Sequence, residues 1–546
     1  MWNVNKLIDR VGDWNAQLFR ELKGRVTSRN ILLATGLSIG SQILLLCTFM
    51  LQLPTNPQPA ASRSSQTYCV LENIKVSNGG FYDQKVCQLN ALGQVSTDWP
   101  HWWADILSAM SWLLPVLLLT GGVYLLANDL RRETKRGTLN FVRLSPQSAA
   151  EIFRGKLLGV PVLVYLAVAV ALPLHFFAAM GSGFGLINAF AWYALMVAIA
   201  TVFYMAAMFL TLASPVVPIA MAGIALWLSS SVLSLTNWLL YAAVSSDPWS
   251  AALPKMHWFY LPITQNLFSF YLFGIGNCLV AIYWLWQSIC RRYQNPHGTL
   301  LAKKSSYQLN LCLQLWLVGF GLPLLTSDSS SALAFFLGGV FVCQICAALV
   351  LIGLLTPQRQ AIQNWSRYRR ASERRKLWQR DIWQDLWGND QSPAVLALIV
   401  NMAIALVIWL PWCSFAFSNG SMAMKTIVAV IITALLFSNY GLLIQMLSIT
   451  KKKWPRQQAI AYMAPLLVFP ASGALLAVMF GKQSIASLIM VIATPLSVFN
   501  IAQISWLQLL VGAVMQSLVS VLAIASLQRQ IRKIGQSETQ TFLSAI

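Results

Sequence analysis

Histidine and carboxylate side chains are the first candidates for chemistry, because they serve as general acids, general bases and metal ligands. The chain has only four histidines, and none forms a convincing metal-ligand spacing with another histidine, a cysteine or a carboxylate. His101 lies near Asp98 and Asp105, and His257 follows Asp247. These groups could perform acid–base catalysis. Because tryptophans flank both histidines, an ordinary interfacial position is the simpler interpretation.

A phosphate-binding loop is the second motif to look for. The pattern Gly-x-x-x-x-Gly-Lys-Ser/Thr, whose backbone amides hold nucleotide phosphates, occurs nowhere in the sequence. The pairs Gly155-Lys156 and Gly481-Lys482 lack both the preceding glycine and the following hydroxyl residue. We therefore expect that the chain does not hydrolyse ATP, is not an enzyme and needs no cofactor or metal of its own.

The composition is that of a membrane protein. Hydrophobic residues make up 57% of the chain and charged residues 10%, whereas soluble domains contain about 25% charged residues. About twelve apolar runs approach the roughly 20 residues that cross a bilayer. The sequence thus predicts an all-α, multi-pass protein of the cell (plasma or inner) membrane. We place the spans at about 31–53, 104–128, 157–180, 188–213, 216–243, 266–289, 310–327, 332–356, 393–417, 424–449, 459–480 and 504–527.

The charge pattern orients these spans. The net charge of +21 comes from 38 basic and 17 acidic residues, and the basic residues gather between spans rather than on one soluble face. Segments 129–156 and 357–392 are strongly basic, whereas the loop at 52–103 has no basic excess. Cytoplasmic segments carry such an excess. We expect the loop outside, both termini in the cytoplasm, and no nucleic-acid partner.

Two cysteines stand apart from the others because they lie in the polar outer loop. Cys69 and Cys87 are predicted to form a disulfide if that loop faces an oxidising compartment. Two free thiols are the alternative.

Residues 1–30 contain charged residues and no apolar core, so we expect that they are not a cleavable signal peptide. Their apolar residues follow helical spacing. We predict an amphipathic helix at the cytoplasmic interface, with a frayed polar tail as the alternative.

The basic segment 129–156 is punctuated by turn residues. Gly137 is suited to end a charged helix, and Thr138 could cap a new one. Pro146 forces a second turn, after which Ser148 could cap the next helix. The pattern predicts a short exposed helix held at a fixed angle between two spans. A solvated connector is the simpler alternative.

The same segment resembles the cytoplasmic segment that follows the second span in ABC-2 type permeases, the membrane subunits of many ATP-driven exporters. The family shows an acidic residue, Gly-Thr-Leu, an apolar stretch, a proline, and Gly-Lys at the next span. The resemblance covers about residues 1–290 and includes residues 19–29 before the first span. In this sequence the residues that carry it, or lie within it, are Glu133, Arg136, Gly137, Thr138, Leu139, Phe141, Leu144, Pro146 and Gly155-Lys156.

The resemblance implies that this segment docks into a groove of a separate ATPase subunit, which binds the ATP. It also implies two six-span halves, at 31–290 and 310–530, joined by a cytoplasmic linker at 291–309 and followed by a tail at 531–546. The second half matches only in layout. There, segment 357–392 would be the corresponding contact, and Trp383 and Trp387 share a helical face. These tryptophans could equally rest at the headgroup boundary.

The resemblance makes a permease subunit the first functional hypothesis. Its cargo is expected to be neutral or amphipathic, because the spans contain almost no ionisable residues. Its expected partners are ABC ATPase subunits and membrane lipid, with a second permease chain as a further candidate. A membrane-embedded enzyme acting on a lipid-linked substrate at the outer face is the second hypothesis. A membrane assembly scaffold without transport is the third.

Overall fold

A computed structural model of the chain describes most of its helices. Most of predicted span 459–480, half of 216–243, Asp247 and His297 fall outside the described ranges. The structure describes residues 11–54, 67–77, 81–90, 93–213, 217–230, 256–264, 267–296, 298–326, 330–371, 382–388, 390–416, 420–450, 472–473, 475–476, 478–479, 481, 483–494, 501 and 503–535.

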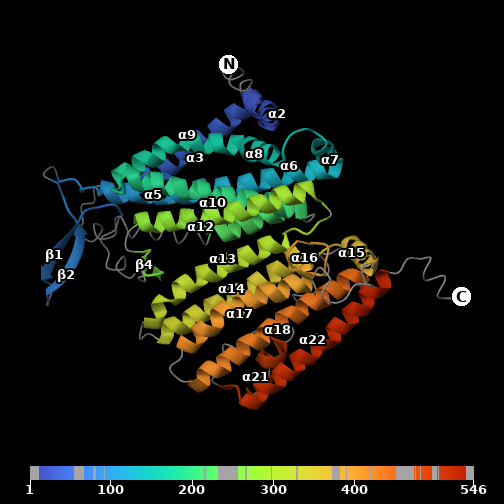
Figure 1. The fold of residues 1–546 in the computed structure, drawn as a ribbon. Helices are drawn as coiled ribbons and strands as arrows, with labels where there is room; N and C mark the ends of the chain where they lie inside the picture. The colour runs from blue at the N-terminus through green and yellow to red at the C-terminus, as the bar shows by residue number, and fades with distance from the viewer. Residues whose placement is uncertain are drawn as a thin grey trace. The chain divides into compact units, whose positions relative to one another are not determined.

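The chain divides into two compact units (Figure 1). Unit 1 comprises Met1–Met256 and Pro262–Gln294, and unit 2 comprises His257–Leu261 and Asn295–Ile546. The described elements of unit 1 are α2 (Ala16–Arg25), α3 (Ser28–Met50), β1 (Leu71–Ser77), β2 (Phe81–Cys87), α5 (Trp99–Val116), the π-helix η1 (Leu117–Gly121), α6 (Gly122–Arg136), α7 (Thr138–Arg143), α8 (Ala149–Gly159), α9 (Val162–Gly181), α10 (Leu186–Ala213) and α12 (Leu267–Gln294). Those of unit 2 are α13 (Lys303–Gly321), the 3₁₀ turn η3 (Pro323–Thr326), α14 (Ser330–Leu355), α15 (Arg359–Ala371), α16 (Ile382–Trp387), α17 (Ala394–Ala416), α18 (Gly420–Thr450), α21 (Gln483–Ala493) and α22 (Trp506–Ile534). Two very short strands, β3 (His257–Trp258) and β4 (Leu261–Pro262), also pair with each other.

The protein is an all-α, multi-pass membrane protein. Within the described ranges, ten helices are long and apolar enough to cross a bilayer. Each coincides with one of the predicted spans. Helices Pro218–Ser230 and Gln483–Ala493 are also apolar but shorter.

Several helices continue past the predicted boundaries. The second span extends to Arg136 rather than ending near residue 128, and α12 and α13 leave only residues 295–302 between them. Charged residues end a hydropathic run but not a helix, because lysine, arginine and glutamate are good helix formers. Residues 291–294 and 303–309 of the predicted linker are therefore helical.

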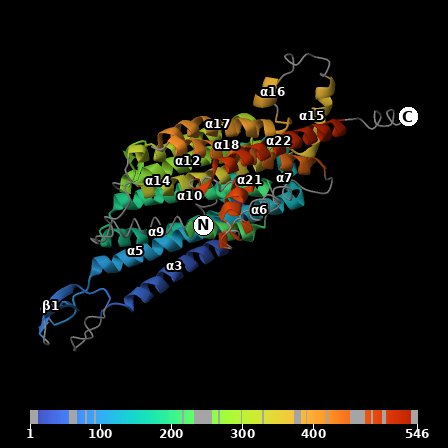
Figure 2. The same ribbon diagram turned by 90° about the horizontal axis from the view of Figure 1, so that it is seen from below.

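Helices α3, α5 and α9 lie side by side in unit 1 (Figure 2). The helix that begins as α5 contains Pro115 and passes through η1 before it continues as α6. Prolines and π-turns free backbone carbonyls. The hydroxyl of Tyr204 donates to the carbonyl oxygen of Leu118 at 2.6 Å. Gly122 makes room for this ring, because a Cβ there would lie 2.2 Å from it.

Unit 2 is held together by amide side chains between its helices. Asn310 Nδ2 donates to the carbonyl oxygen of Asn401 at 2.7 Å, and Trp409 Nε1 donates to Gln314 at 2.7 Å. Between α18 and α22, Asn439 Nδ2 donates to Gln516 Oε1 at 2.7 Å. Such bonds join helices where apolar packing alone gives little preference over lipid.

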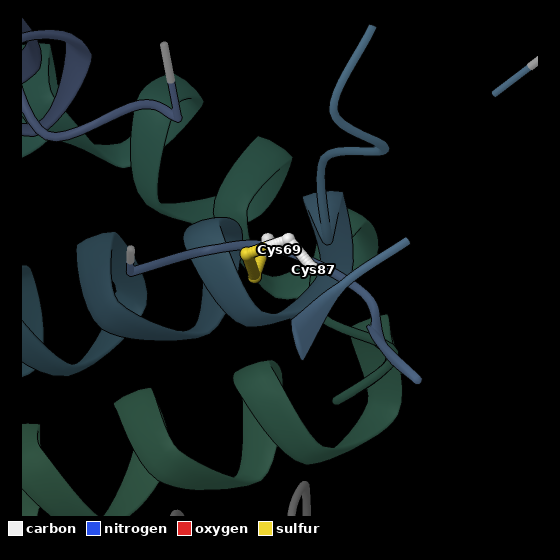
Figure 3. Close-up of a disulfide and its surroundings, with 2 residues drawn as sticks. All are labelled: Cys69 and Cys87. Carbon is white, nitrogen blue, oxygen red and sulfur yellow. A yellow bond between two sulfur atoms is a disulfide. The ribbon is translucent and has the colours of Figure 1, made fainter. Parts of the chain in front are cut away.

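The loop that was predicted to lie outside contains a hairpin. Strands β1 and β2 pair antiparallel, at the end of unit 1 opposite α7 (Figures 1 and 2). Cys69 and Cys87 form a disulfide with Cα atoms 5.4 Å apart (Figure 3). Next to it, the buried hydroxyl of Tyr68 donates to Asp105 of α5 at 2.7 Å. The loop is thus fixed to the helix that follows it.

We predict that the disulfide forms in the protein isolated from its membrane, because the Cα separation suits an unstrained bridge. Digestion without reductant should yield one cross-linked pair containing Cys69 and Cys87, and an alkylating reagent should label neither residue before reduction. The free thiol of Cys290 serves as the labelled control in denaturant. Alkylation of Cys69 or Cys87 before reduction would contradict the prediction.

Candidate functional site

The N-terminal helix α2 packs against α8 (Figure 1). Asn15 caps it, accepting from the backbone of Leu18 at 2.8 Å and donating to the carbonyl oxygen of Glu151 at 2.8 Å. Gln17 and Glu21 are buried with Leu18. The predicted amphipathic helix therefore packs part of its polar face against other helices of the protein. Buried polar side chains need hydrogen-bond or ionic partners, so α2 requires such partners at this contact.

Two glycines of α8 allow this close approach. A Cβ at Gly155 would lie 2.7 Å from the backbone nitrogen of Leu18, and one at Gly159 would lie 2.6 Å from Glu21 Cβ. Real Cβ atoms essentially never come so near. The Gly-Lys pair thus has a local structural role. Gly155 allows α2 to approach α8 closely, and Lys156 pairs with Glu21 of α2.

A buried ammonium lies at the centre of the contact. Lys156, 1% exposed, places Nζ 2.7 Å from Asp129, 2.9 Å from Glu133 and 3.4 Å from Glu21. Burial opposes its charge, but the carboxylates of Asp129, Glu21 and Glu133 outweigh this effect and raise the pKa of Lys156. Lys156 is therefore charged at neutral pH.

Two arginines of α2 complete the cluster. Arg25 pairs with Asp129 at 2.7 Å and with Glu21 at 3.1 Å, and Arg20 pairs with Glu133 at 2.6 Å. We call Arg20, Glu21, Arg25, Asp129, Glu133 and Lys156 the ion cluster. Its three cations balance its three carboxylates. The carboxylate oxygens lie within 4.8 Å of one another, but the lysine ammonium already occupies the position a metal ion would take.

The segment after α6 makes two sharp turns. Gly137 ends α6 in the left-handed region with φ +73°, a conformation that favours glycine. Thr138 does not cap α7 as predicted. It is the first helical residue, and its hydroxyl donates back to the carbonyl oxygen of Glu133 at 3.2 Å. Ser148 caps α8 in a reciprocal capping box with Glu151.

The predicted coupling residues separate into two groups on this element. Leu139 is buried against the protein, and Glu133 belongs to the ion cluster. Phe141 and Leu144 project outward, 78% and 85% exposed. Arg136, Gly137, Thr138 and Pro146 are also exposed. The short helix thus presents two large apolar side chains on a base fixed by ion pairs.

In unit 2, a second buried lysine holds the segment before α17. Lys303 Nζ donates to the carbonyl oxygen of Asp385 at 2.7 Å and to the hydroxyl of Ser392. Trp387 is half-exposed, with its ring 5.5 Å from that of Tyr307. The side chain of Trp383 lies outside the described residues, so its predicted partnership with Trp387 stays a prediction.

Unit 2 also contains an apolar cavity of about 100 Å³ between α14, α17 and α18. Its lining is mostly aliphatic and aromatic, with Gln344, Thr426 and Thr433 as polar members. A cavity of this chemistry accepts apolar groups rather than ions.

The residues proposed for acid–base chemistry have structural contacts. Asp98 caps α5, accepting from the backbone of His101 at 3.2 Å. Asp105 accepts from Tyr68, and burial together with this carboxylate raises the pKa of that hydroxyl, which therefore stays protonated as a donor. Another histidine, His175, was not among the proposed residues, and its Nε2 lies 3.0 Å from Ser111 Oγ.

Comparison with protein-family models, with curated proteins and with solved structures found no match for this chain. The site therefore has to be interpreted from its own geometry.

Sequence reasoning did not predict the ion cluster. Asp129 and Glu133 are spaced one helical turn apart in a chain that has only 17 acidic residues. That spacing, beside a lysine at the start of the next span, was the available signal. The contact between Lys156 and Glu21 could not be predicted from local sequence, because the two residues are 135 positions apart.

We predict that Lys156→Met destabilises unit 1 by roughly 3–5 kcal/mol, because the three carboxylates of the ion cluster are then balanced by only two arginines and one negative charge is left uncompensated. Thermal unfolding of the purified protein in mild detergent would measure the loss, with Arg132→Gln on the exposed surface of α6 as the control. A lysine whose pKa is raised by folding contributes its full stabilisation at any pH below its pKa in the unfolded chain, about 10.4. It loses that stabilisation only as the pH rises through its pKa in the folded protein. The loss should therefore be equal at about pH 7 and about pH 9. An unchanged unfolding temperature would contradict the prediction.

We also predict that Gly155→Ala lowers stability by about 1–3 kcal/mol, because its Cβ would meet the backbone of α2. Gly24→Ala is the matched control, since a Cβ there meets nothing within 4 Å and alanine favours the helix by about 0.5–1 kcal/mol. Opposite shifts in unfolding temperature are expected. Equal effects of the two substitutions would rule out close packing of α2 on α8.

Proposed function

We propose that this protein is a membrane-spanning permease subunit of an ATP-driven exporter, of the ABC-2 type that its segment 129–156 resembles. The observation that carries the proposal is the pair of exposed side chains, Phe141 and Leu144, on the short helix α7. Large apolar side chains that project from a fixed base are suited to fill a pocket of a partner protein.

The ion cluster supports a mechanical role for this helix. A force on α7 passes to α6 through Gly137 and to α8 through the capped turn at Ser148. Lys156 joins α8 to both α6 and α2. The element therefore moves as one body with the ends of the membrane helices, which is what a partner needs in order to shift them.

The energy source would be a separate ATPase subunit, since the sequence has no phosphate-binding loop. The segment of unit 2 held by Lys303, with half-exposed Trp387, is proposed as the second contact. The aliphatic cavity of unit 2 and the amide-bonded spans favour a neutral or amphipathic cargo over an ion. We propose the cell membrane as the site of action, with α7 in the cytoplasm.

We predict that Phe141→Asp combined with Leu144→Asp lowers the yield of a co-purifying ATPase at least about tenfold, because charge at the centre of an interface removes its apolar anchors. The test uses tagged full-length chain isolated from its native membrane in mild detergent, with peptide mass spectrometry to identify a subunit that contains a phosphate-binding loop. Unfolding temperature should not change, since both side chains are exposed.

Arg132→Gln controls for a general loss of basic charge in the same segment and should retain the ATPase. If the unaltered chain brings down no such subunit, or if the double variant retains it at the control level, the proposed function is wrong.

A further inference from the structure

A second group of side chains surrounds Tyr293, in the last turn of α12. The guanidinium of Arg143, from α7, lies over its ring at 5.1 Å from the centroid. Phe153 of α8 meets the same ring edge-on at 5.3 Å. Tyr293 is only 4% exposed. Three elements of unit 1 thus converge on one aromatic ring.

Two hydrogen-bond donors of this group have no acceptor. The hydroxyl of Tyr293 and the Nε of Arg143 are both buried, and neither has a partner among the residues that the structure describes. Buried polar groups are nearly always hydrogen-bonded, so each of these donors indicates a missing acceptor. Among the described residues, the Arg143 side chain donates from Nη1 to the neutral side chain of Asn140 at 2.8 Å.

The surroundings are rich in positive charge. Arg292 lies on the same turn of α12 as Tyr293 and interacts electrostatically with Arg143. Arg154 of α8 lies within electrostatic range of Cys290, one turn away on α12. The carboxylate of Glu133 acts on Tyr293 electrostatically, but it is already paired with Lys156 and Arg20. Within the described part of the chain, no carboxylate forms an ion pair with Arg143.

We propose that this group binds a phosphate, with the Tyr293 hydroxyl and Arg143 as donors and Arg154 and Arg292 as additional charge. A phosphate group accepts several hydrogen bonds at once and matches the planar donors of guanidinium. The site lies where α12 ends, the depth at which lipid headgroups meet a spanning helix. An anionic lipid headgroup and a soluble phosphate share this chemistry. The inference is independent of the proposed function.

The test uses full-length protein in mild detergent and three probes: phosphatidylglycerol, phosphatidylcholine and inorganic phosphate. Native mass spectrometry would measure bound lipid, and the rise in unfolding temperature would measure binding of each probe. We expect phosphatidylglycerol or inorganic phosphate to bind more tightly than phosphatidylcholine. Tyr293→Phe keeps the ring under Arg143 but removes the hydroxyl, so binding should weaken about tenfold with the fold intact. Arg143→Gln should weaken it at least as much.

Arg132→Gln removes the same charge from the exposed surface of α6 and should leave binding unchanged. Tight binding of phosphatidylglycerol alone would identify the ligand as a lipid headgroup, and tight binding of inorganic phosphate would identify a soluble anion. The proposal is overturned if neither probe exceeds phosphatidylcholine, if Tyr293→Phe and Arg143→Gln bind like the unaltered chain, or if Arg132→Gln weakens binding equally.

Discussion

The arrangement of unit 1 depends on the ion pairs that the buried ammonium of Lys156 forms with three carboxylates. Removing a lysine and three carboxylates from water is unfavourable by several kcal/mol for each charge unless the groups meet in good geometry. Here the contacts of 2.7 and 2.9 Å, together with the two arginines of α2, supply that geometry. The charges therefore stabilise only one arrangement of α2, α6 and α8. Any other register would leave them buried and unpaired.

The two units use a buried lysine differently. In unit 1 the partners of Lys156 are carboxylates, whereas the nearest partners of Lys303 in unit 2 are a backbone carbonyl and a serine hydroxyl. The carboxylates of Asp385 and Asp390 also act on Lys303 electrostatically and offset part of the cost of burying its charge. In both units the lysine fixes the stretch just before the third long helix, by direct ion pairs in unit 1 and by hydrogen bonds to neutral groups, with carboxylates nearby, in unit 2.

Local sequence signals predicted the fold well. Ten helices coincide with predicted spans because a long apolar run has only one stable state in a bilayer. Gly137 and Ser148 act as expected, since glycine in the left-handed region and a capping serine are local effects. Thr138 failed as a cap because Gly137 already occupies the position before the helix. The predicted ends of the second span and of the span that became α12 were too early, because charged residues lower the hydropathy of these segments while still favouring a helix.

Contacts between residues far apart in the sequence could not be predicted. Nothing near Glu21 in sequence indicates Lys156 as its partner, and nothing near Arg143 indicates the ring of Tyr293. Such matches depend on which faces the spans present after packing. Glycines were an indirect signal: Gly155 and Gly159, one turn apart, mark the surface where another backbone comes close.

The long separation between Glu21 and Lys156 also sets an order of events during biosynthesis. The first helix leaves the ribosome with its buried-to-be carboxylate and arginines unpaired, and it waits until 135 further residues have been made. By then α3, the hairpin of β1 and β2, and the helix that ends as α6 have emerged. Helix α2 can therefore dock only after these elements have brought Glu21 and Lys156 to the same end of unit 1.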